Sequence, residues 1–220
     1  MNRVLILRPQ PGADETVARA KALGLEPVVA PLFTVRPLDW AMPGGSFDAL
    51  LLTSANGARH GVRPELAHLP CYAVGEATAQ AARQAGVTEV FAGPADGMAA
   101  VELMAEAGVK RALHLCGRDH VALSHPEVRI ERRIVYAAEA VAELPQAAQR
   151  VGALVLLHSP RAATLFGSLV AHRSVLHLAA ISAATAHAAG TGWAAVHIAA
   201  KPRDEALLEL AVRLCKTGVF

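Results

Sequence analysis

Five short segments of the chain place hydroxyl, amide, glycine or arginine groups directly after an apolar run, and most of them open a segment of helical period. They are Thr53-Ser54-Ala55-Asn56, Gly75-Glu76-Ala77-Thr78, Cys116-Gly117-Arg118, His158-Ser159-Pro160-Arg161 and Ser182-Ala183-Ala184-Thr185. The first turn of a helix has N–H groups without partners and a partial positive charge, so it attracts anions. The segments therefore indicate a site for carboxylates or phosphates. The alternative is that Ser54, Ser159 and Ser182 only cap their helices.

Three arginines and one tyrosine add groups that suit such a ligand. Arg8, Arg118 and Arg161 directly follow predicted strands, and a guanidinium holds a carboxylate with two parallel hydrogen bonds. The alternative for each is an exposed surface charge. Tyr136, one of 2 tyrosines, ends a predicted strand, where its phenol can donate a proton or a hydrogen bond to a ligand. The alternative for Tyr136 is a core ring with its hydroxyl at the rim.

Common nucleotide-binding and catalytic motifs are absent from the sequence. It contains no Gly-x-Gly-x-x-Gly, no Gly-x-x-x-x-Gly-Lys-Ser/Thr and no Gly-x-Ser-x-Gly. The 3 cysteines lie far apart and none of the 10 histidines forms His-Glu-x-x-His, so we expect no metal site. A site poor in strong acids and bases is typical of a protein that positions an anionic, already reactive molecule.

The composition is that of a compact globular protein. Hydrophobic residues make up 53% of the 220 residues and charged residues 18%, unlike a disordered chain. The 21 basic and 19 acidic side chains give a net charge of +2, too small for the basic field typical of nucleic-acid binding. The start resembles no secretion signal, and no apolar run reaches the roughly 18 residues that cross a bilayer. We expect a cytoplasmic protein with neither a nucleic-acid nor a membrane partner.

Short apolar runs alternate with alanine-rich segments of helical period, which predicts an α/β fold with mostly parallel sheets flanked by helices. The apolar runs suggest more strands than one sheet comfortably holds. Helices are expected near residues 13–23, 55–61, 76–85, 97–107, 144–150, 160–170, 183–189 and 204–216, with caps at Ser54, Asp96, Ser159, Ser182 and Asp204.

An internal repeat divides the chain into two similar halves. Residues 48–58 align without a gap on residues 153–163, and residues 71–82 align on residues 178–189. The offsets, 105 and 107 residues, are far longer than the roughly 20–50 residues of a solenoid repeat. The repeat therefore predicts two lobes with a ligand cleft between them, where loops at the carboxyl ends of the strands would meet the ligand.

Over essentially its full length the chain resembles the uroporphyrinogen-III synthase family. The resemblance rests on the order and spacing of Leu7-Arg8-Pro9, Phe47-Asp-Ala-Leu-Leu-Leu-Thr53-Ser54-Ala-Asn56, Ala73-Val74-Gly75-Glu-Ala-Thr78-Ala, Gly117-Arg118, Val135-Tyr136, His158-Ser159-Pro160, Ala180-Ile181-Ser-Ala-Ala-Thr185-Ala and Lys201-Pro202-Arg-Asp-Glu-Ala-Leu. The chain departs from the family pattern at Ser182, where glycine is usual, and at Lys201-Pro202-Arg203, which replaces a segment rich in serine, proline and threonine.

The resemblance implies how the halves fold. Each lobe would be a flavodoxin-like parallel sheet flanked by helices. Residues 1–35 and 142–220 would form a discontinuous lobe, and residues 38–138 the other. A two-stranded connection near residues 33–38 and 136–142 would join them.

The resemblance also implies a reaction of tetrapyrrole biosynthesis, the route to haem. Hydroxymethylbilane, a linear tetrapyrrole with an acetate and a propionate on each ring, would lose its hydroxyl and close to uroporphyrinogen III. The last ring would be inverted through a spiro intermediate, without cofactor or metal. We further expect a monomer, and a transient contact with hydroxymethylbilane synthase that would hand over the unstable substrate.

Site residues carry over from the family position by position. Tyr136 is expected to assist loss of the hydroxyl. Substrate-contacting positions of the family fall on Thr53, Ser54, Thr78, Arg118, Ser159 and Thr185. From the pattern at the strand ends we add Arg8, Asn56 and Gly75 as substrate-binding residues. Two other functions remain open from the residues alone: a non-catalytic two-lobed binding module for an anionic metabolite, and an enzyme acting on phosphosugars.

Overall fold

The computed structural model describes residues 2–93, 96–149 and 152–218. The chain divides into two compact units. Unit 1 consists of Met1–Thr34 and Glu139–Phe220, and unit 2 consists of Val35–Ala138. Two strands, β3 (Phe33–Pro37) and β8 (Arg129–Ala140), run across the boundaries between the units and are neighbours in one sheet.

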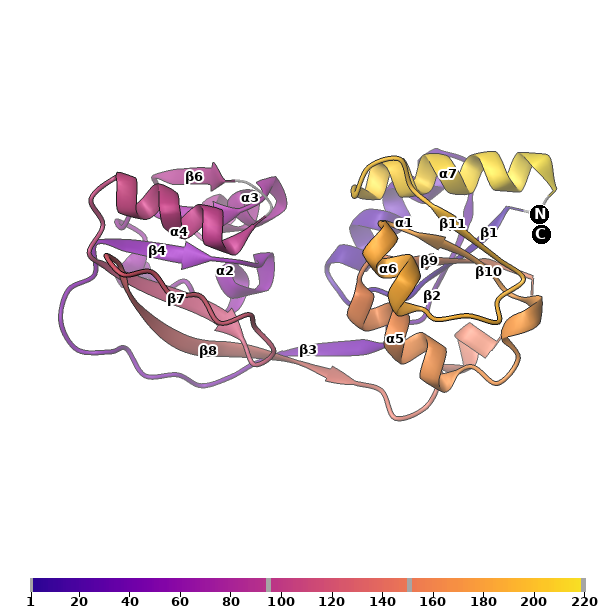
Figure 1. Cartoon of the computed structure of the whole chain (residues 1–220), viewed down its shortest axis with the longest axis horizontal. Coiled ribbons are helices and arrows are strands. Elements are labelled where there is room, and N and C mark those ends of the chain that lie inside the picture. Colours follow the sequence, from indigo (N-terminus) through magenta and orange to yellow (C-terminus); the bar gives the residue numbers. More distant parts are fainter. Residues whose placement is uncertain (1, 94–95, 150–151, 219–220) are drawn as a thin grey trace. The chain divides into compact units, whose positions relative to one another are not determined.

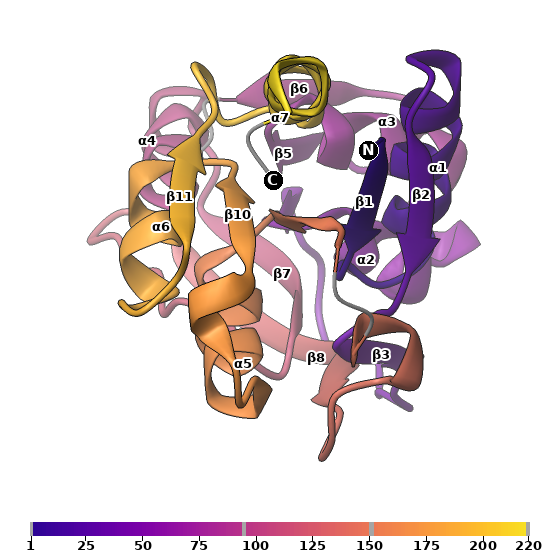
Figure 2. The same cartoon turned by 90° about the vertical axis from the view of Figure 1, so that its right-hand side faces the viewer.

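Unit 1 contains a parallel sheet of five strands in the order β11-β10-β9-β1-β2 (Figure 2). The strands are β1 (Arg3–Ile6), β2 (Glu26–Val29), β9 (Leu154–Leu157), β10 (His177–Ala180) and β11 (Ala195–Ile198). The central strand β9 is buried on both faces. Such an uninterrupted apolar run is typical of a parallel strand covered by helices on both sides.

Four helices flank this sheet: α1 (Gly12–Ala22), α5 (Pro160–Leu169), α6 (Ala183–Ala188) and α7 (Asp204–Thr217). Residues of α1 and α7 share one apolar cluster with Val4, Ile6, Leu154 and Leu156 of the sheet. Helices α5 and α6 pack against each other. The alternate residues of β1 and β9 thus face α1 and α7, because successive side chains of a strand point to opposite faces.

Unit 2 contains a sheet in the order β3-β8-β7-β4-β5-β6, in which the strands from β8 to β6 pair in parallel (Figure 1). The remaining strands are β4 (Ala49–Leu52), β5 (Cys71–Val74), β6 (Val90–Gly93) and β7 (Arg111–Gly117). A register shift between Cys116 and Gly117 interrupts the pairing of β7 with β8. The shift lies at the carboxyl end of β7, where a bulge can redirect a side chain.

Helices α2 (Ala55–Gly61) and α3 (Glu76–Gln84) cover one face of this sheet, packing on Leu50, Leu52, Leu113 and Leu115. Helix α4 (Gly97–Glu106) covers the other face together with Leu123 and Val128. Leu123 and Val128 belong to the segment between β7 and β8, which contains no helix over residues 118–128. Short 3-10 turns occupy Pro64–Leu66, Gln146–Gln149 and Arg173–Val175.

The predicted α/β fold with parallel sheets flanked by helices is confirmed. Four predicted caps are also correct, because the side chains of Ser54, Asp96, Ser159 and Ser182 accept hydrogen bonds from N–H groups in the first turns of α2, α4, α5 and α6.

Three predictions of local structure were wrong. Arg203 is the N-cap of α7, and Asp204 lies inside the helix with its carboxylate bound elsewhere. The helix predicted at residues 144–150 is a 3-10 turn over Gln146–Gln149, with residue 150 outside the described residues. Strand β8 continues to Ala140, so Tyr136 lies within it rather than at its end.

No helix in the described part of the chain is long and apolar enough to cross a membrane.

Candidate functional site

The carboxyl ends of the unit 2 strands border a cavity of about 450 Å³. Three predicted site residues, Thr53, Ser54 and Tyr136, lie in its wall. The rest of the wall comes from the end of β5, the start of α4 and the segment after β7, namely Val74, Asp96, Gly97, Met98, Gly117, Asp119, His120, Val121 and Leu123. Ligands of parallel α/β sheets bind at this edge, which makes the cavity the candidate site of unit 2.

Ser54 and Tyr136 are joined by a hydrogen bond of 2.9 Å between Oγ and the phenol oxygen. Ser54 Oγ also accepts the N–H of Gly57 at 3.2 Å, which caps α2. A serine oxygen has two acceptor positions and one proton. Ser54 can therefore cap the helix and still donate to Tyr136, which leaves the phenol proton for a group in the cavity.

Glycine at position 117 makes room for the ring of Tyr136. A Cβ at residue 117 would lie 2.6 Å from Cζ and 2.8 Å from the phenol oxygen of Tyr136. Real side chains do not approach so closely, so only glycine allows this position of the ring. The backbone N–H of Arg118 donates to the carbonyl of Tyr136 at 3.0 Å, which fixes the backbone of the same residue.

Thr53 is held by a buried histidine. Its Oγ1 lies 3.0 Å from Nε2 of His114, a residue of β7 that is 0% exposed. Burial, followed by the nearby His120 and Arg132, lowers the pKa of His114 to about 4. The ring is thus neutral near pH 7 and carries one N–H.

The position of that N–H determines what Thr53 can do. Nδ1 of His114 has no hydrogen-bond partner among the described residues, and a buried N–H without a partner is costly. We therefore assign the proton to Nε2, which donates to Thr53 Oγ1. The hydroxyl proton of Thr53 is then directed to another acceptor, and an acceptor carboxylate in the cavity would suit it.

The other predicted residues of unit 2 lie around this edge but do not line the cavity. Asn56 accepts a hydrogen bond from Arg59 at 3.3 Å. Gly75 is the N-cap of α3 with φ +76°, in the region that favours glycine, and Thr78 in the first turn of that helix is buried. Arg118 is exposed and directly follows β7.

In unit 1, two predicted residues lie at the starts of helices. Ser159 caps α5, its Oγ accepting the N–H of Ala162 at 3.2 Å. Thr185 in the first turn of α6 is 0% exposed, and its Oγ1 lies 3.1 Å from Oγ of Ser182. Ser182 has φ −156° in extended backbone and also accepts the N–H of Thr185. The serine that replaces the usual family glycine therefore caps α6 with its side chain.

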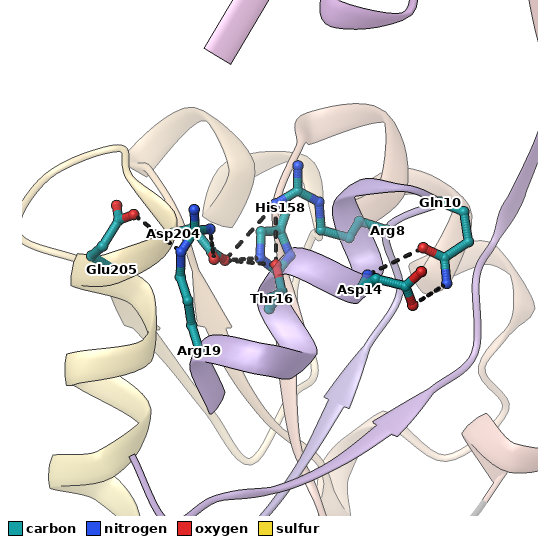
Figure 3. Close-up of polar contacts among 8 residues, drawn as sticks. All are labelled: Arg8, Gln10, Asp14, Thr16, Arg19, His158, Asp204 and Glu205. Carbon is teal, nitrogen blue, oxygen red and sulfur yellow. Dashed lines mark hydrogen bonds and ion pairs between the residues drawn. The ribbon is translucent and has the colours of Figure 1, made fainter. Parts of the chain in front are cut away.

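The third predicted residue of unit 1, Arg8, contacts a polar cluster centred on Asp204 (Figure 3). Nη1 of Arg8 donates to Thr16 Oγ1 at 3.2 Å and lies 3.9 Å from Asp204 Oδ1. Thr16 in turn donates to Asp204 at 3.0 Å. Arg19 donates to the same carboxylate at 2.8 Å.

His158, the last residue before the cap of α5, completes the cluster with a hydrogen bond of 2.8 Å from Nε2 to Asp204. Burial outweighs the nearby carboxylate and lowers the pKa of His158. For Asp204 the balance is reversed. Burial opposes its ionisation, but hydrogen bonds from His158, Arg19 and Thr16 lower its pKa to about 2. The carboxylate is therefore charged over the whole neutral range.

Sequence reasoning missed His114, His120, Thr16 and the role of Asp204. His114 stands inside an apolar run, and its polar neighbour Thr53 is 61 residues away along the chain. A histidine at the middle of an otherwise buried strand is the one local signal that could have drawn attention to it. In the described residues no group of three His, Cys, Asp or Glu side chains is placed to hold a metal ion.

Fold and site together define a class of protein: a two-unit parallel α/β protein with helix starts and polar side chains at the carboxyl ends of its strands. The family profile of uroporphyrinogen-III synthase HemD matches residues 14–209. The chain therefore belongs to the uroporphyrinogen-III synthase family, which confirms the resemblance read from the sequence and the enzyme type expected from it.

Solved structures of the same family share the fold. The chain is 20% identical to uroporphyrinogen-III synthetase from Helicobacter pylori, with a TM-score of 0.69 over 97% of this chain and 99% of that one. It is 16% identical to a mutant uroporphyrinogen III synthase from Thermus thermophilus, with a TM-score of 0.54 over 99% of this chain and 100% of that one. A search of curated protein sequences found no match.

Proposed function

We propose that the chain converts hydroxymethylbilane into uroporphyrinogen III, with loss of water and inversion of the last ring through a spiro intermediate. The match of the family profile to residues 14–209 is the observation that carries this proposal. The site supports it, because the hydroxyls of the cavity wall, together with the helix starts and arginines outside it, suit a substrate with many carboxylates. The wall also contains two carboxylates, Asp96 and Asp119.

Tyr136 assists departure of the hydroxyl in this proposal. Ser54 donates to the phenol oxygen, and the phenol proton then points to the leaving oxygen of the substrate. A hydrogen bond there stabilises the negative charge that develops as the C–O bond breaks. The bond to Ser54 keeps the phenol in place, and glycine at position 117 leaves room for its ring, so little reorganisation is needed when the substrate binds.

The remaining proposed residues bind carboxylates. In unit 2 one donor is the hydroxyl of Thr53, which His114 positions. The starts of α2 and α3, near Ser54, Asn56, Gly75 and Thr78, supply further donors, and Arg118 after β7 supplies a guanidinium. In unit 1 the donors are Arg8 and the starts of α5 and α6, near Ser159 and Thr185. The bound tetrapyrrole folds so that the hindered ring carbon comes close to the carbon that has lost its hydroxyl. This positioning of the substrate supplies most of the rate increase.

Several finer points belong to the same proposal. They are action without a cofactor, as a monomer in the cytoplasm, and a transient contact with hydroxymethylbilane synthase that protects the unstable substrate. The ligand cleft expected between the two lobes also stays a prediction.

A product analysis tests the proposal directly. The purified protein is incubated with freshly made hydroxymethylbilane, the product is oxidised, and the porphyrin isomers are separated by chromatography. Without an enzyme the bilane closes to the symmetrical type I isomer. We expect predominantly type III. Type I alone from folded protein would contradict the proposal and favour the alternative of a non-catalytic binding module for an anionic metabolite.

A further inference from the structure

His120 lies in the same cavity wall as Tyr136. Its Nδ1 lies 3.0 Å from the carbonyl oxygen of Gly117 and 3.2 Å from that of Arg118. Carbonyl oxygens only accept hydrogen bonds, so Nδ1 carries a proton. The opposite nitrogen, Nε2, is therefore the atom of this ring that gains or loses a proton, and it has no hydrogen-bond partner among the described residues.

Gly117 lies next to both rings. Its carbonyl accepts from His120, while the absence of a side chain on its Cα makes room for Tyr136. Gly117 is the last residue of β7 and follows the register shift after Cys116. An imidazole and a phenol are thus held by one backbone residue beside one cavity, a pattern that serves proton transfer when the substrate lies between or beside them.

We propose that His120 is a second catalytic residue, whose Nε2 gives a proton to the departing hydroxyl and takes a proton back after the ring has closed. This inference rests on the proposed function. Imidazole is the side chain that both donates and accepts protons near neutral pH. A phenol ordinarily keeps its proton there, so Tyr136 contributes a hydrogen bond and His120 contributes the proton.

The protons and electrons of this step balance. The C–O bond of the hydroxymethyl group breaks, its electron pair stays on oxygen, and the proton from Nε2 completes a water molecule. The positive charge moves from the imidazolium to the pyrrole that has lost the hydroxyl. New C–C bonds then form, and the last cationic intermediate loses one proton to Nε2. The product is neutral at its rings and the imidazolium is restored.

Other charged or titratable groups from neighbouring elements surround this imidazole. They are His114 of β7, with a distance of 6.3 Å between ring centroids, Tyr136 and Arg132 of β8, Asp96 at the start of α4, and Arg118 and Asp119 of the same segment.

Two substitutions of His120 distinguish proton transfer at Nε2 from the hydrogen bond that Nδ1 donates to the Gly117 carbonyl. In His120→Asn the side-chain amide N–H can still donate to the Gly117 carbonyl, but nothing titrates at the place of Nε2. We expect the rate of type III formation to fall about 100-fold, the usual scale for a lost acid or base, with an unchanged thermal unfolding midpoint. The dependence of the rate on pH between 5.5 and 8.5, followed for wild type and variant, should lose the step that His120 causes.

The second substitution, His120→Ala, is tested with added imidazole. Recovery of at least part of the rate would support proton transfer, because a purely structural role would not respond to free imidazole. The matched control is His125→Asn, in the same segment, where Nδ1 only accepts the N–H of Glu127 at 3.2 Å; this variant should keep the wild-type rate.

The outcomes distinguish the two proposals. If wild type makes type III and His120→Asn does so within twofold of its rate and with the same pH profile, the role of His120 is wrong and the proposed function stands. If wild type makes only type I, the proposed function fails and the role of His120 fails with it. Loss of rate in His120→Ala without any response to imidazole, together with an unchanged pH profile in His120→Asn, also overturns the role.

Discussion

Five strands of unit 2 follow the same order as the five strands of unit 1. The two units differ in the connection between the last two strands of that order. In unit 1 the order is β11-β10-β9-β1-β2, and in unit 2 the corresponding strands are β6-β5-β4-β7-β8. Helix α1 connects β1 to β2, whereas residues 118–128 connect β7 to β8 without a helix. The helix brings Thr16 and Arg19 to the carboxylate of Asp204, while the helix-free segment brings His120 to an open cavity.

Equivalent positions of the two units also differ in which of them carries a polar residue. His114 pairs with Leu51 in the register of unit 2, and Ile6 pairs with Leu156 at the corresponding place in unit 1. Thr53 at the end of β4 corresponds to His158 at the end of β9, because the repeat matches Ser54 to Ser159. Each unit thus keeps one buried histidine near this edge. In unit 1 it binds Asp204, and in unit 2 it positions a hydroxyl at the cavity.

The largest contrast should come from the matched aspartates. Asp204 and Asp96 correspond in the repeat, but Asp204 is buried among polar partners whereas Asp96 is an exposed cap of α4. Asp204→Ala leaves two buried donors, the hydroxyl of Thr16 and Nε2 of His158, without their acceptor. At about 1–3 kcal/mol for each, we expect a loss of about 3–5 kcal/mol in the free energy of unfolding. Asp96→Ala should cost about 1 kcal/mol. Denaturant titration of both variants measures this, and equal losses would show that the polar cluster of unit 1 adds nothing beyond a cap.

A pH experiment on His114→Ile makes unit 2 resemble unit 1 at this register position. The pKa of His114 is about 4 in the folded chain against an ordinary 6.5, so the unfolded state binds more protons between these values. Stability therefore rises with pH across this window and is lost as the pH falls from 6.5 towards 4. The shift corresponds to about 3 kcal/mol at most.

We expect His114→Ile to flatten this dependence, measured as the free energy of unfolding at pH 4.5 and 7. The flattening is partial, because burial also lowers the pKa of His158 in unit 1. The exposed His68 provides the control, and His68→Gln should leave the slope unchanged. A slope in His114→Ile equal to that of wild type would mean that His114 is not a buried neutral group.

Gly117→Ala tests whether unit 2 depends on its glycine beneath the tyrosine. The added Cβ would meet Tyr136 Cζ at 2.6 Å, so the ring must move. Displacement of a catalytic group by about 1 Å can reduce the rate by about 100-fold, and we expect a loss of that order in type III formation. Gly44→Ala is the control, because a Cβ there meets nothing within 4 Å. Wild-type activity in Gly117→Ala would remove this position of Tyr136 from the mechanism.

Local patterns in the sequence predicted the elements well, because their causes are local. Apolar runs mark the parallel strands, and Ser54, Ser159 and Ser182 sit where a cap is needed. The polar cluster could not be predicted this way. Asp204 has the residue type of a cap, but its partners Thr16 and Arg19 are 188 and 185 residues away along the chain. Contacts between residues so far apart in the sequence depend on how the strands are ordered in the sheet. The pattern within a single segment does not predict them.

The smallest expected difference in stability is between variants of the two turns that precede α3 and α6. Gly75 has φ +76° and ψ 157°, and a Cβ there would meet nothing within 4 Å, whereas Ser182 has φ −156° and caps its helix. Gly75→Ala should cost about 1–3 kcal/mol from backbone strain alone. Ser182→Gly removes one capping hydrogen bond and should cost only about 0.3 kcal/mol, since glycine is itself accepted at this position. Thermal unfolding of both variants compares them. A larger loss for Ser182→Gly would show that the bond between Ser182 and the buried Thr185, rather than the turn's backbone, holds the start of α6.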